Sequence, residues 1–208
     1  MKIIHTADLH LESKMGVNLA KQQSEKRRNE LLFTFEKLAF EAESKGIKVI
    51  IIAGDMFDTK SLTKKSKEYI LNIFKNHQDI DFIYTSGNHD ENNFFFDLEE
   101  LPENFKTFND EWKTYSYEDV EITGINYNEK TDMIMYDTLN LDKSKKNIVV
   151  LHGQVSTYKQ TGCININQLM DKGIDYLALG HIHSYKKDRI DERGIWAYSG
   201  CLEARGFD

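Results

Sequence analysis

Polar side chains follow five short apolar runs in this chain, each at a point where a strand is expected to end. The runs cover residues 3–7, 49–53, 82–86, 148–151 and 176–180. Short apolar runs of this kind are typical of buried strands. Because loops at the ends of neighbouring strands carry the functional groups of many enzymes, such a chain gathers its polar groups on one sheet rim. The sequence therefore predicts a single site assembled from segments far apart in the chain.

The polar residues after these runs have the chemistry of metal ligands. They are Asp8, His10, Asp55, Asn88, His152, His181 and His183. Carboxylate, imidazole and amide donors without thiolate suit Mn, Fe or Zn, whereas calcium prefers more oxygens. Seven donors exceed the need of one site that keeps a position open for substrate. We therefore expect two divalent ions with one shared ligand, Mn being the leading candidate and Fe or Zn the alternatives.

The charge of such a centre favours an anionic substrate. Two divalent ions would bring four positive charges, of which Asp8 and Asp55 cancel two, because His and Asn bind as neutral groups. The remaining positive charge suits a phosphate ester. The expected reaction is hydrolysis of that ester by water activated between the metals.

Five sequence blocks, in this order, resemble the calcineurin-like metallophosphoesterases. They are Asp8-Leu9-His10, Gly54-Asp55-Met56-Phe57-Asp58, Gly87-Asn88-His89-Asp90, His152-Gly153 and Gly180-His181-Ile182-His183. The resemblance extends from Met1 to about Arg205. It implies that one metal lies among Asp8, His10, Asp55 and His183, and the other among Asp55, Asn88, His152 and His181. It also implies an α/β fold, a four-layer α/β/β/α sandwich of two mixed sheets flanked by helices.

His89 and Asp58 are the residues that we expect to serve proton transfer. In the family that the chain resembles, the histidine at the His89 position approaches the phosphate rather than a metal. Asp58 would orient the His89 imidazole and favour its protonated form, which could then stabilise charge on the phosphoryl oxygens or the leaving group. The alternative for Asp58 is a solvated residue that caps the following helix. Asp90 is expected at most to bond backbone groups in its turn.

Within the superfamily, the segments around Asp8 and Asp55 look most like the SbcD-type DNA repair exonucleases. That likeness implies DNA as a substrate, a coiled-coil ATPase of the SbcC type as a partner, and a C-terminal DNA-binding cap. A homodimer is a further hypothesis. The 208 residues are expected to form a single catalytic domain, residues 1–208, without that cap.

Composition is compatible with one globular domain in the cytoplasm. The chain is 40% hydrophobic and 29% charged, lacks an apolar stretch near the ~20 residues of a membrane span, and opens directly into its first strand. Cys163 and Cys201 are read as reduced thiols, although a disulfide between them stays open. The net charge of −7 argues against a strongly basic nucleic-acid surface. Lysine clusters at Lys64, Lys143 and Lys186 are either solvated faces or local DNA contacts.

Apolar periodicity predicts an alternation of helices and strands. Helices are expected over 22–44, 61–74 and 164–170, the first from the spacing of its apolar side chains and its end before Gly46. Strand pairs are expected within 114–127 and as a hairpin of 185–190 with 195–199. Three glycines, Gly54, Gly87 and Gly180, directly precede expected ligands and are predicted to let the chain leave a strand sharply.

Two other functions remain open at this stage. The same metal ligands would serve a phosphodiesterase or phosphatase acting on a small molecule or phosphoprotein, and activity on DNA against a small diester separates the two. A metal-free scaffold that keeps the fold for protein binding is the alternative of another class. The presence of all seven expected ligands argues against the scaffold, and metal analysis of the purified protein decides.

Overall fold

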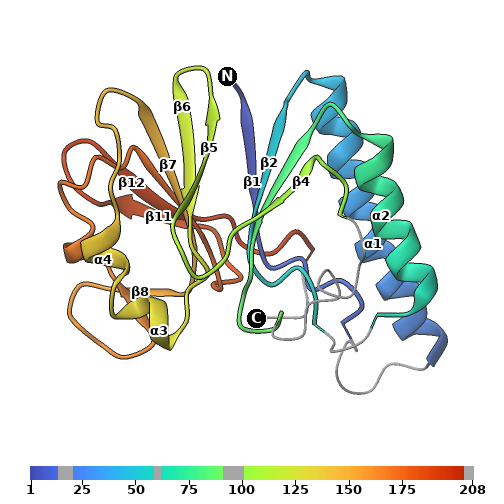
Figure 1. Ribbon diagram of the computed structural model, residues 1–208. Helices are drawn as coiled ribbons and strands as arrows, with labels where there is room; N and C mark the ends of the chain where they lie inside the picture. Colours follow the sequence, from blue (N-terminus) through green and yellow to red (C-terminus); the bar gives the residue numbers. More distant parts are fainter. Residues whose placement is uncertain (14–20, 59–61, 91–100, 204–208) are drawn as a thin grey trace.

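The computed structural model describes residues 1–13, 21–58, 62–90 and 101–203. Two sheets pack face to face, and two long helices cover the outer side of the first sheet (Figure 1). Short helices and loops lie on the outer side of the second sheet. The α/β sandwich predicted from the sequence is confirmed, with a second helical layer reduced to single turns.

The first sheet is parallel throughout its described strands. Its order is β1 (Ile3–Thr6), β2 (Val49–Ala53), β3 (Asp81–Thr85) and β4 (Phe105–Thr107). All five β2 residues are buried, as expected for a strand that is covered on both faces. Parallel pairing places the carboxyl ends of these strands at one rim, and Asp8, Asp55 and Asn88 follow three of them.

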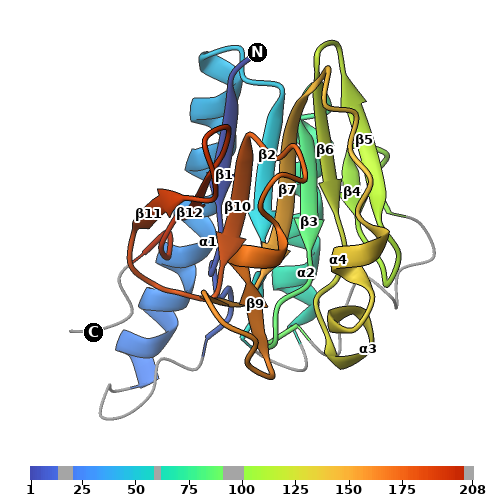
Figure 2. The same cartoon turned by 90° about the vertical axis from the view of Figure 1, so that its left-hand side faces the viewer.

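The second sheet is mixed. Its order is β11 (Lys186–Arg189), β12 (Ile195–Tyr198), β10 (Tyr176–Gly180), β7 (Lys146–His152), β6 (Val120–Gly124) and β5 (Lys113–Tyr117). The central strands β6, β7, β10 and β12 are parallel, and both outer pairs are antiparallel. The two strand pairs predicted from the sequence are thus confirmed. Figure 2 shows β10 and β7 side by side in this sheet.

Two long helices shield the first sheet. They are α1 (Lys21–Ser44) and α2 (Lys64–Asn76), close to the predicted ranges. Thr63 caps α2 by accepting the Ser66 N–H, which defines where that helix begins. The buried side of α1 includes Leu31, Phe35 and Ala42, as its spacing predicts. None of the described helices is long and apolar enough to cross a membrane.

One predicted helix is wrong. Residues 164–170 form the end of β9 (Cys163–Asn165), followed by one 3-10 turn, η2 (Ile166–Gln168). β9 pairs with β8 (Gln154–Ser156), so pairing with a neighbouring segment overrides the local preference. Two four-residue helices, α3 (Glu129–Asp132) and α4 (Met135–Thr138), lie before β7.

Three apolar clusters hold the layers together. One lies between the first sheet and its helices, a second on the outer side of the second sheet, and a third between the sheets. The third includes the small residues Ala7, Ala53 and Ala178, all buried. Small side chains let the two sheets approach closely, which draws together the rims that carry the candidate site.

Candidate metal centre

All nine residues proposed from the sequence come together at the carboxyl ends of strands from both sheets. β1, β2 and β3 supply Asp8, His10, Asp55, Asn88 and His89, while β7 and β10 supply His152, His181 and His183. Asp58 follows Asp55 in the loop after β2. In Figure 1 the first strand runs downward from the N-terminus, so this rim lies at the lower ends of the central strands.

The first cluster consists of Asp8, His10 and His183. Ligand atoms of the three residues lie within 4.8 Å of one another. The Nε2 atoms of His10 and His183 are 3.1 Å apart, so both rings point to the same place. Asp8 also lies within 4.8 Å of donor atoms of Asp55 and His152. The first cluster is therefore joined to the second through neighbouring carboxylates.

The second cluster consists of Asp55, Asn88, His152 and His181. The Asn88 Oδ1 lies 3.1 Å from His152 Nε2 and 3.1 Å from His181 Nδ1. His152 Nε2 is 3.5 Å from the Asp55 Oδ2. Four donors of three chemical types thus converge, an arrangement that fits a borderline divalent metal.

His152 is held in the form that a metal requires. Its Nδ1 lies 2.9 Å from the Ala53 carbonyl oxygen, to which it can donate, and this leaves Nε2 with its lone pair toward the cluster. Burial lowers the pKa of His152 to about 4, opposed by the Ala53 carbonyl. The ring is therefore neutral near pH 7 and able to act as a ligand.

Asp55 is a buried carboxylate that a nearby cation would stabilise. Burial raises its pKa, while the backbone N–H of His89, which donates to Oδ1 at 2.9 Å, acts in the opposite direction. His89 and His181 lower the pKa further through their charge. A bound cation would favour the ionised form in the same way.

Four of the seven expected ligands have a backbone conformation that is unusual for a residue other than glycine. Asp8, His10, Asp55 and His181 have φ angles of 53°, 45°, 49° and 104°. Left-handed backbone costs a non-glycine residue roughly 1 to 2 kcal/mol. Such conformations persist only when surrounding structure holds them, and they concentrate at functional sites. Backbone hydrogen bonds hold two of these residues in place, because the N–H groups of Asp8 and His10 donate to the carbonyls of Gly54 and Asp55.

The glycines before the ligands matter mainly because other residues occupy the space that a side chain would need. All three were predicted to let the chain leave its strand in a conformation that a side chain would resist, but only Gly54 has a positive φ, of 88°. A Cβ on Gly54 would overlap the His152 ring, and one on Gly87 would overlap the Asp55 carboxylate. A Cβ on Gly180 would overlap the Ala53 carbonyl oxygen in the other sheet. These glycines let the ligand-bearing segments touch.

The His89 imidazole lies against Asp58, as the sequence predicted. Its Nδ1 is 3.0 Å from the Asp58 Oδ1, and the Ser13 hydroxyl donates to Oδ2 at 2.7 Å. Asp58 Oδ1 also lies 3.7 Å from His10 Nδ1. Because Thr63 caps α2, the helix-capping alternative for Asp58 is excluded. Asp58 is instead a carboxylate fixed between a hydroxyl and two imidazoles.

Comparison with known proteins agrees with this geometry. The family model for calcineurin-like phosphoesterases matches residues 1–185. The chain belongs to the calcineurin-like phosphoesterase family. This membership places it among hydrolases of phosphate esters. The resemblance seen in the five sequence blocks is thereby confirmed.

Two relatives of this phosphoesterase are named DNA double-strand break repair protein Mre11. The protein from Methanosarcina acetivorans is 27% identical over 98% of the chain and 34% of its own length. The protein from Sulfolobus acidocaldarius is 29% identical over 96% of the chain and 54% of its own length. The chain thus spans about a third to half of these relatives.

Solved structures share the fold of the phosphoesterase. A protein of Thermus thermophilus, TT1561, superposes with a TM-score of 0.61 at 11% identity, covering 96% of this chain and 89% of that one. A dimetal phosphatase from Danio rerio also gives 0.61, at 9% identity, covering 96% and 86%. At such identities the likeness concerns the fold alone.

Asp90 has a larger role than the sequence indicated. Its carboxylate accepts the N–H groups of Met56, Phe57 and Gly87, at 3.3, 3.0 and 2.9 Å. Burial raises its pKa, and the bonds from Gly87 and Phe57 lower it. Asp90 therefore ties the loop after β2 to the loop after β3. The Gly-Asn-His-Asp block gave the position of this residue, but not its partners Met56 and Phe57, which lie 34 and 33 residues away.

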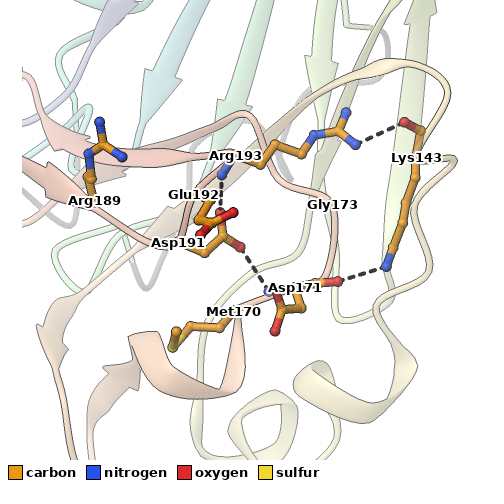
Figure 3. A pocket seen from close by; sticks show the side chains of 8 residues that line it. All are labelled: Lys143, Met170, Asp171, Gly173, Arg189, Asp191, Glu192 and Arg193. Atoms are coloured by element: carbon orange, nitrogen blue, oxygen red, sulfur yellow. Dashed lines mark hydrogen bonds between the residues drawn. The ribbon is translucent and has the colours of Figure 1, made fainter.

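A cavity of about 700 Å³ lies away from the metal-centre rim of the phosphoesterase (Figure 3). Several of the residues that line it form hydrogen bonds with one another. Arg193 donates to the Lys143 carbonyl, the Lys143 ammonium donates to the Asp171 carbonyl, and Asp191 accepts the Asp171 N–H. We therefore interpret this cavity as a structural junction between the loops before β7 and β10 and the turn between β11 and β12.

The two cysteines and His5 lie outside the metal centre. Cys163 and Cys201 are both free, as expected. The His5 Nδ1 lies 2.8 Å from the Tyr176 hydroxyl of the second sheet. This contact agrees with the prediction that His5 is structural.

Proposed function

We propose that this phosphoesterase binds two divalent metal ions and hydrolyses phosphodiester bonds, with DNA as its substrate. The observation that carries the proposal is the convergence of two donor clusters, linked through Asp8, Asp55 and His152, at one rim. DNA is favoured over other esters because two relatives that cover nearly the whole chain are named for DNA double-strand break repair.

The two clusters would hold the metals in the arrangement that the sequence blocks imply. Asp8, His10 and His183 would bind one ion, Asn88, His152 and His181 the other, and Asp55 both. Such ions polarise phosphoryl oxygens and lower the pKa of bound water toward neutrality. The donor set favours Mn, Fe or Zn, and Mn is our leading candidate.

His89 would transfer the proton that the leaving oxygen needs. It is exposed at the rim while its Nδ1 faces Asp58, so Nε2 is the atom available to the substrate. Asp58 keeps the ring in one orientation because Ser13 fixes its other oxygen. A positioned acid of this kind typically contributes ~100-fold or more to the rate.

The test combines metal content with turnover. Purified protein is analysed for Mn, Fe and Zn, and then assayed on linear DNA and on a small diester with each metal. We expect Asp55→Asn to lose metal and hydrolysis together, because the amide cannot supply the anionic donor. Full metal content with full activity in this variant would sink the two-metal proposal.

The same assay separates the rival functions. Turnover of the small diester without degradation of DNA would favour a small-molecule phosphodiesterase. Metal-free protein that neither takes up metal nor turns over any ester would favour the scaffold. Association with a coiled-coil ATPase, formation of a homodimer and location in the cytoplasm remain predictions for the full protein.

A further inference from the structure

Tyr198, the last residue of β12, holds the segment that follows the expected ligand His152. Its side chain is buried, with 1% of the residue exposed. The hydroxyl donates to the Gly153 carbonyl oxygen at 2.9 Å and accepts the Val155 N–H at 2.8 Å, across 45 and 43 residues of chain. Burial raises the pKa of Tyr198, so the hydroxyl keeps the proton that it donates. One buried oxygen thus connects β12 to the segment directly after a ligand.

The chain passes from one sheet to another in this segment. β7 ends at His152, which pairs with Gly180 at the end of β10. The Gly153 N–H still donates to the Gly180 carbonyl, at 3.2 Å. β8 then pairs with β9 in a separate two-stranded sheet. Gly153 alone lies between β7 and β8, and Tyr198 bonds both to this residue and to the strand beyond it.

The position of His152 decides where its free ring nitrogen lies. Nδ1 faces the Ala53 carbonyl oxygen at 2.9 Å, while Nε2 is 3.1 Å from the Asn88 Oδ1 and 3.5 Å from the Asp55 Oδ2. Bonds from a metal to imidazole tolerate deviations of only roughly 0.2 Å. Movement of the segment after His152 would therefore displace Nε2 from the other donors of the second cluster.

A second buried tyrosine shows what a purely structural hydroxyl looks like. Tyr136 on α4 is 7% exposed and belongs to the same apolar cluster as Tyr198, on the outer side of the second sheet. Its hydroxyl accepts the Asn165 N–H at 2.8 Å, at the end of β9. Asn165 is not adjacent to an expected ligand. Of these two tyrosines, only Tyr198 bonds to a residue that directly follows one.

We propose that Tyr198 is a positioning residue of the metal centre, and that its hydroxyl holds the His152 Nε2 where the second cluster can bind a divalent ion. The inference rests on the proposed function and deepens it, because it names a residue that sets the affinity of one metal site without being a ligand. Tyr198→Phe removes the hydroxyl and leaves the ring in the core. Loss of an outer contact that orients a ligand typically lowers metal affinity by about 10- to 100-fold.

The first test measures metal affinity without turnover. Purified protein is freed of metal with a chelator and titrated with Mn²⁺, and free Mn²⁺ is followed by electron paramagnetic resonance. We expect Tyr198→Phe to bind the same number of ions as the native protein, at least one of them about 10-fold or more weakly. Unchanged affinity for every ion would overturn the inference.

Tyr136→Phe is the matched control for this titration. It also removes one buried hydroxyl that accepts a backbone N–H from a strand of the two-stranded sheet. Both variants should lower the midpoint of urea unfolding of the metal-free protein. Only Tyr198→Phe should weaken Mn²⁺ binding. An equal loss of Mn²⁺ affinity in the two variants would reduce Tyr198 to a general contribution to stability and overturn the inference.

The second test follows the His152 ring itself in metal-free protein. Nitrogen-15 NMR distinguishes the two ring nitrogens of a neutral histidine, and His152→Gln assigns the signals. In native protein the proton should lie on Nδ1, which faces the Ala53 carbonyl. We expect the His152 signals to shift or broaden in Tyr198→Phe and to stay unchanged in Tyr136→Phe. Identical His152 signals in native protein and Tyr198→Phe would overturn the inference whether or not metal binds.

The third test asks whether excess metal restores turnover. Tyr198→Phe keeps every expected ligand, so Mn²⁺ raised about 100-fold above the native Kd should return most of the native kcat on a small diester. His152→Ala lacks the ligand itself and should not recover at the same concentration. A loss of kcat in Tyr198→Phe that persists when Mn²⁺ is saturating would contradict a role through metal affinity.

These results separate the inference from the proposed function. Protein that takes up no Mn²⁺, with His152 ring signals that depend on the Tyr198 hydroxyl, would remove the two-metal centre and keep the positioning of His152 by Tyr198. Two bound ions whose affinities do not depend on Tyr198 would keep the proposed function and overturn the inference.

Discussion

At the scale of single residues, the centre depends on side chains whose second polar atom is already engaged. The Nδ1 atom of His152 lies against the Ala53 carbonyl oxygen, and the Nδ1 atom of His89 lies against the Asp58 carboxylate. The Oδ2 atom of Asp58 accepts the Ser13 hydroxyl. Each therefore presents one defined atom to the centre, which limits both the tautomer and the orientation of the rings. Catalytic groups need this restriction because small displacements cost large factors in rate.

The first residue-scale prediction separates acid from ligand. His89→Ala should keep most bound metal and lower kcat by ~100-fold or more, since a positioned proton donor contributes on that scale. Asp58→Asn should give a smaller loss with the metals retained. Both losses should shrink for diesters with good leaving groups, which need less help from an acid. Metal analysis and kcat on two diesters measure this, and loss of metal in His89→Ala would make His89 a ligand.

The second residue-scale prediction concerns acid stability. Burial lowers the pKa of His5 to about 4 from an ordinary 6.5, opposed by the Leu179 backbone, and its Nε2 is shielded from solvent. The unfolded chain thus takes up the proton first. The stabilising effect of the neutral ring is complete above about pH 6.5 and is lost as the pH falls toward 4. In that window His5 should contribute a slope of about 1.4 kcal/mol per pH unit.

His5→Gln should remove that part of the slope. Urea unfolding at several pH values, with chelator present, gives the free energy of unfolding for both proteins. His152, whose pKa is lowered similarly, should leave a remaining slope in the variant. Identical slopes in the two proteins would contradict the prediction.

The candidate reactive residues could be predicted from the sequence, but the residues that hold them in place could not. Asp58 and His89 were paired correctly because family blocks place both beside the ligands. Ser13 and the full role of Asp90 were missed, since spacing along the chain gives no sign of a contact across 45 or 33 residues. The positive φ angles of Asp55 and His181 were also missed, because the unusual backbone was expected at the glycines that precede them, and glycine is the usual carrier of positive φ.

At the scale of elements, the central strands of the two large sheets and the two long helices were predicted, whereas β4, β8, β9 and the short helices were not. The apolar runs of the buried strands and the helical spacing of apolar residues in α1 can be recognised from each segment alone, and their predicted ranges are confirmed. α3 and α4 have four residues each, too few for a period of 3.6 to show. Residues 163–165 became a strand because residues 154–156 offered a partner, a fact absent from the local pattern.

The element-scale prediction tests the close approach of the two sheets. Gly180 at the end of β10 meets the Ala53 carbonyl of β2 and the His152 ring, so Gly180→Ala forces strands or ligands apart. We expect a loss of about 1 to 3 kcal/mol in stability and reduced metal content. Gly46→Ala is the control, because it adds strain at φ 64° with no atom within 4 Å. Unfolding curves and metal analysis distinguish the two, and normal metal content in Gly180→Ala would contradict the argument.

At the scale of the whole molecule, both sheets contribute to the centre. Asp8 and Asp55 belong to the first sheet, and His152, His181 and His183 to the second. The N–H of His181 donates to both Asp8 oxygens, at 3.0 and 3.1 Å, which already joins the sheets at this rim. Bound ions would join them further and offset the strained conformations of their ligands.

Removal of metal should therefore lower global stability. A ligand present at a thousand times its Kd stabilises the folded state by about 4 kcal/mol. For a chain of this size, chelation should lower Tm by on the order of 10 °C. Calorimetry with and without chelator, followed by readdition of Mn, measures the shift. A Tm that does not respond to metal would argue against binding of metal by residues of both sheets.

The edge strand β11 has a consequence for the behaviour of the protein in concentrated solution. Its four residues, Lys186, Lys187, Asp188 and Arg189, are all exposed, and it is the outermost strand of the six-stranded sheet. An edge strand can pair with a strand of another molecule through its outer backbone groups, and charged side chains on such a strand disfavour that pairing. We therefore expect this cluster of charges, which the sequence offered as a DNA contact or a solvated face, to disfavour pairing of β11 with a strand of a neighbouring molecule.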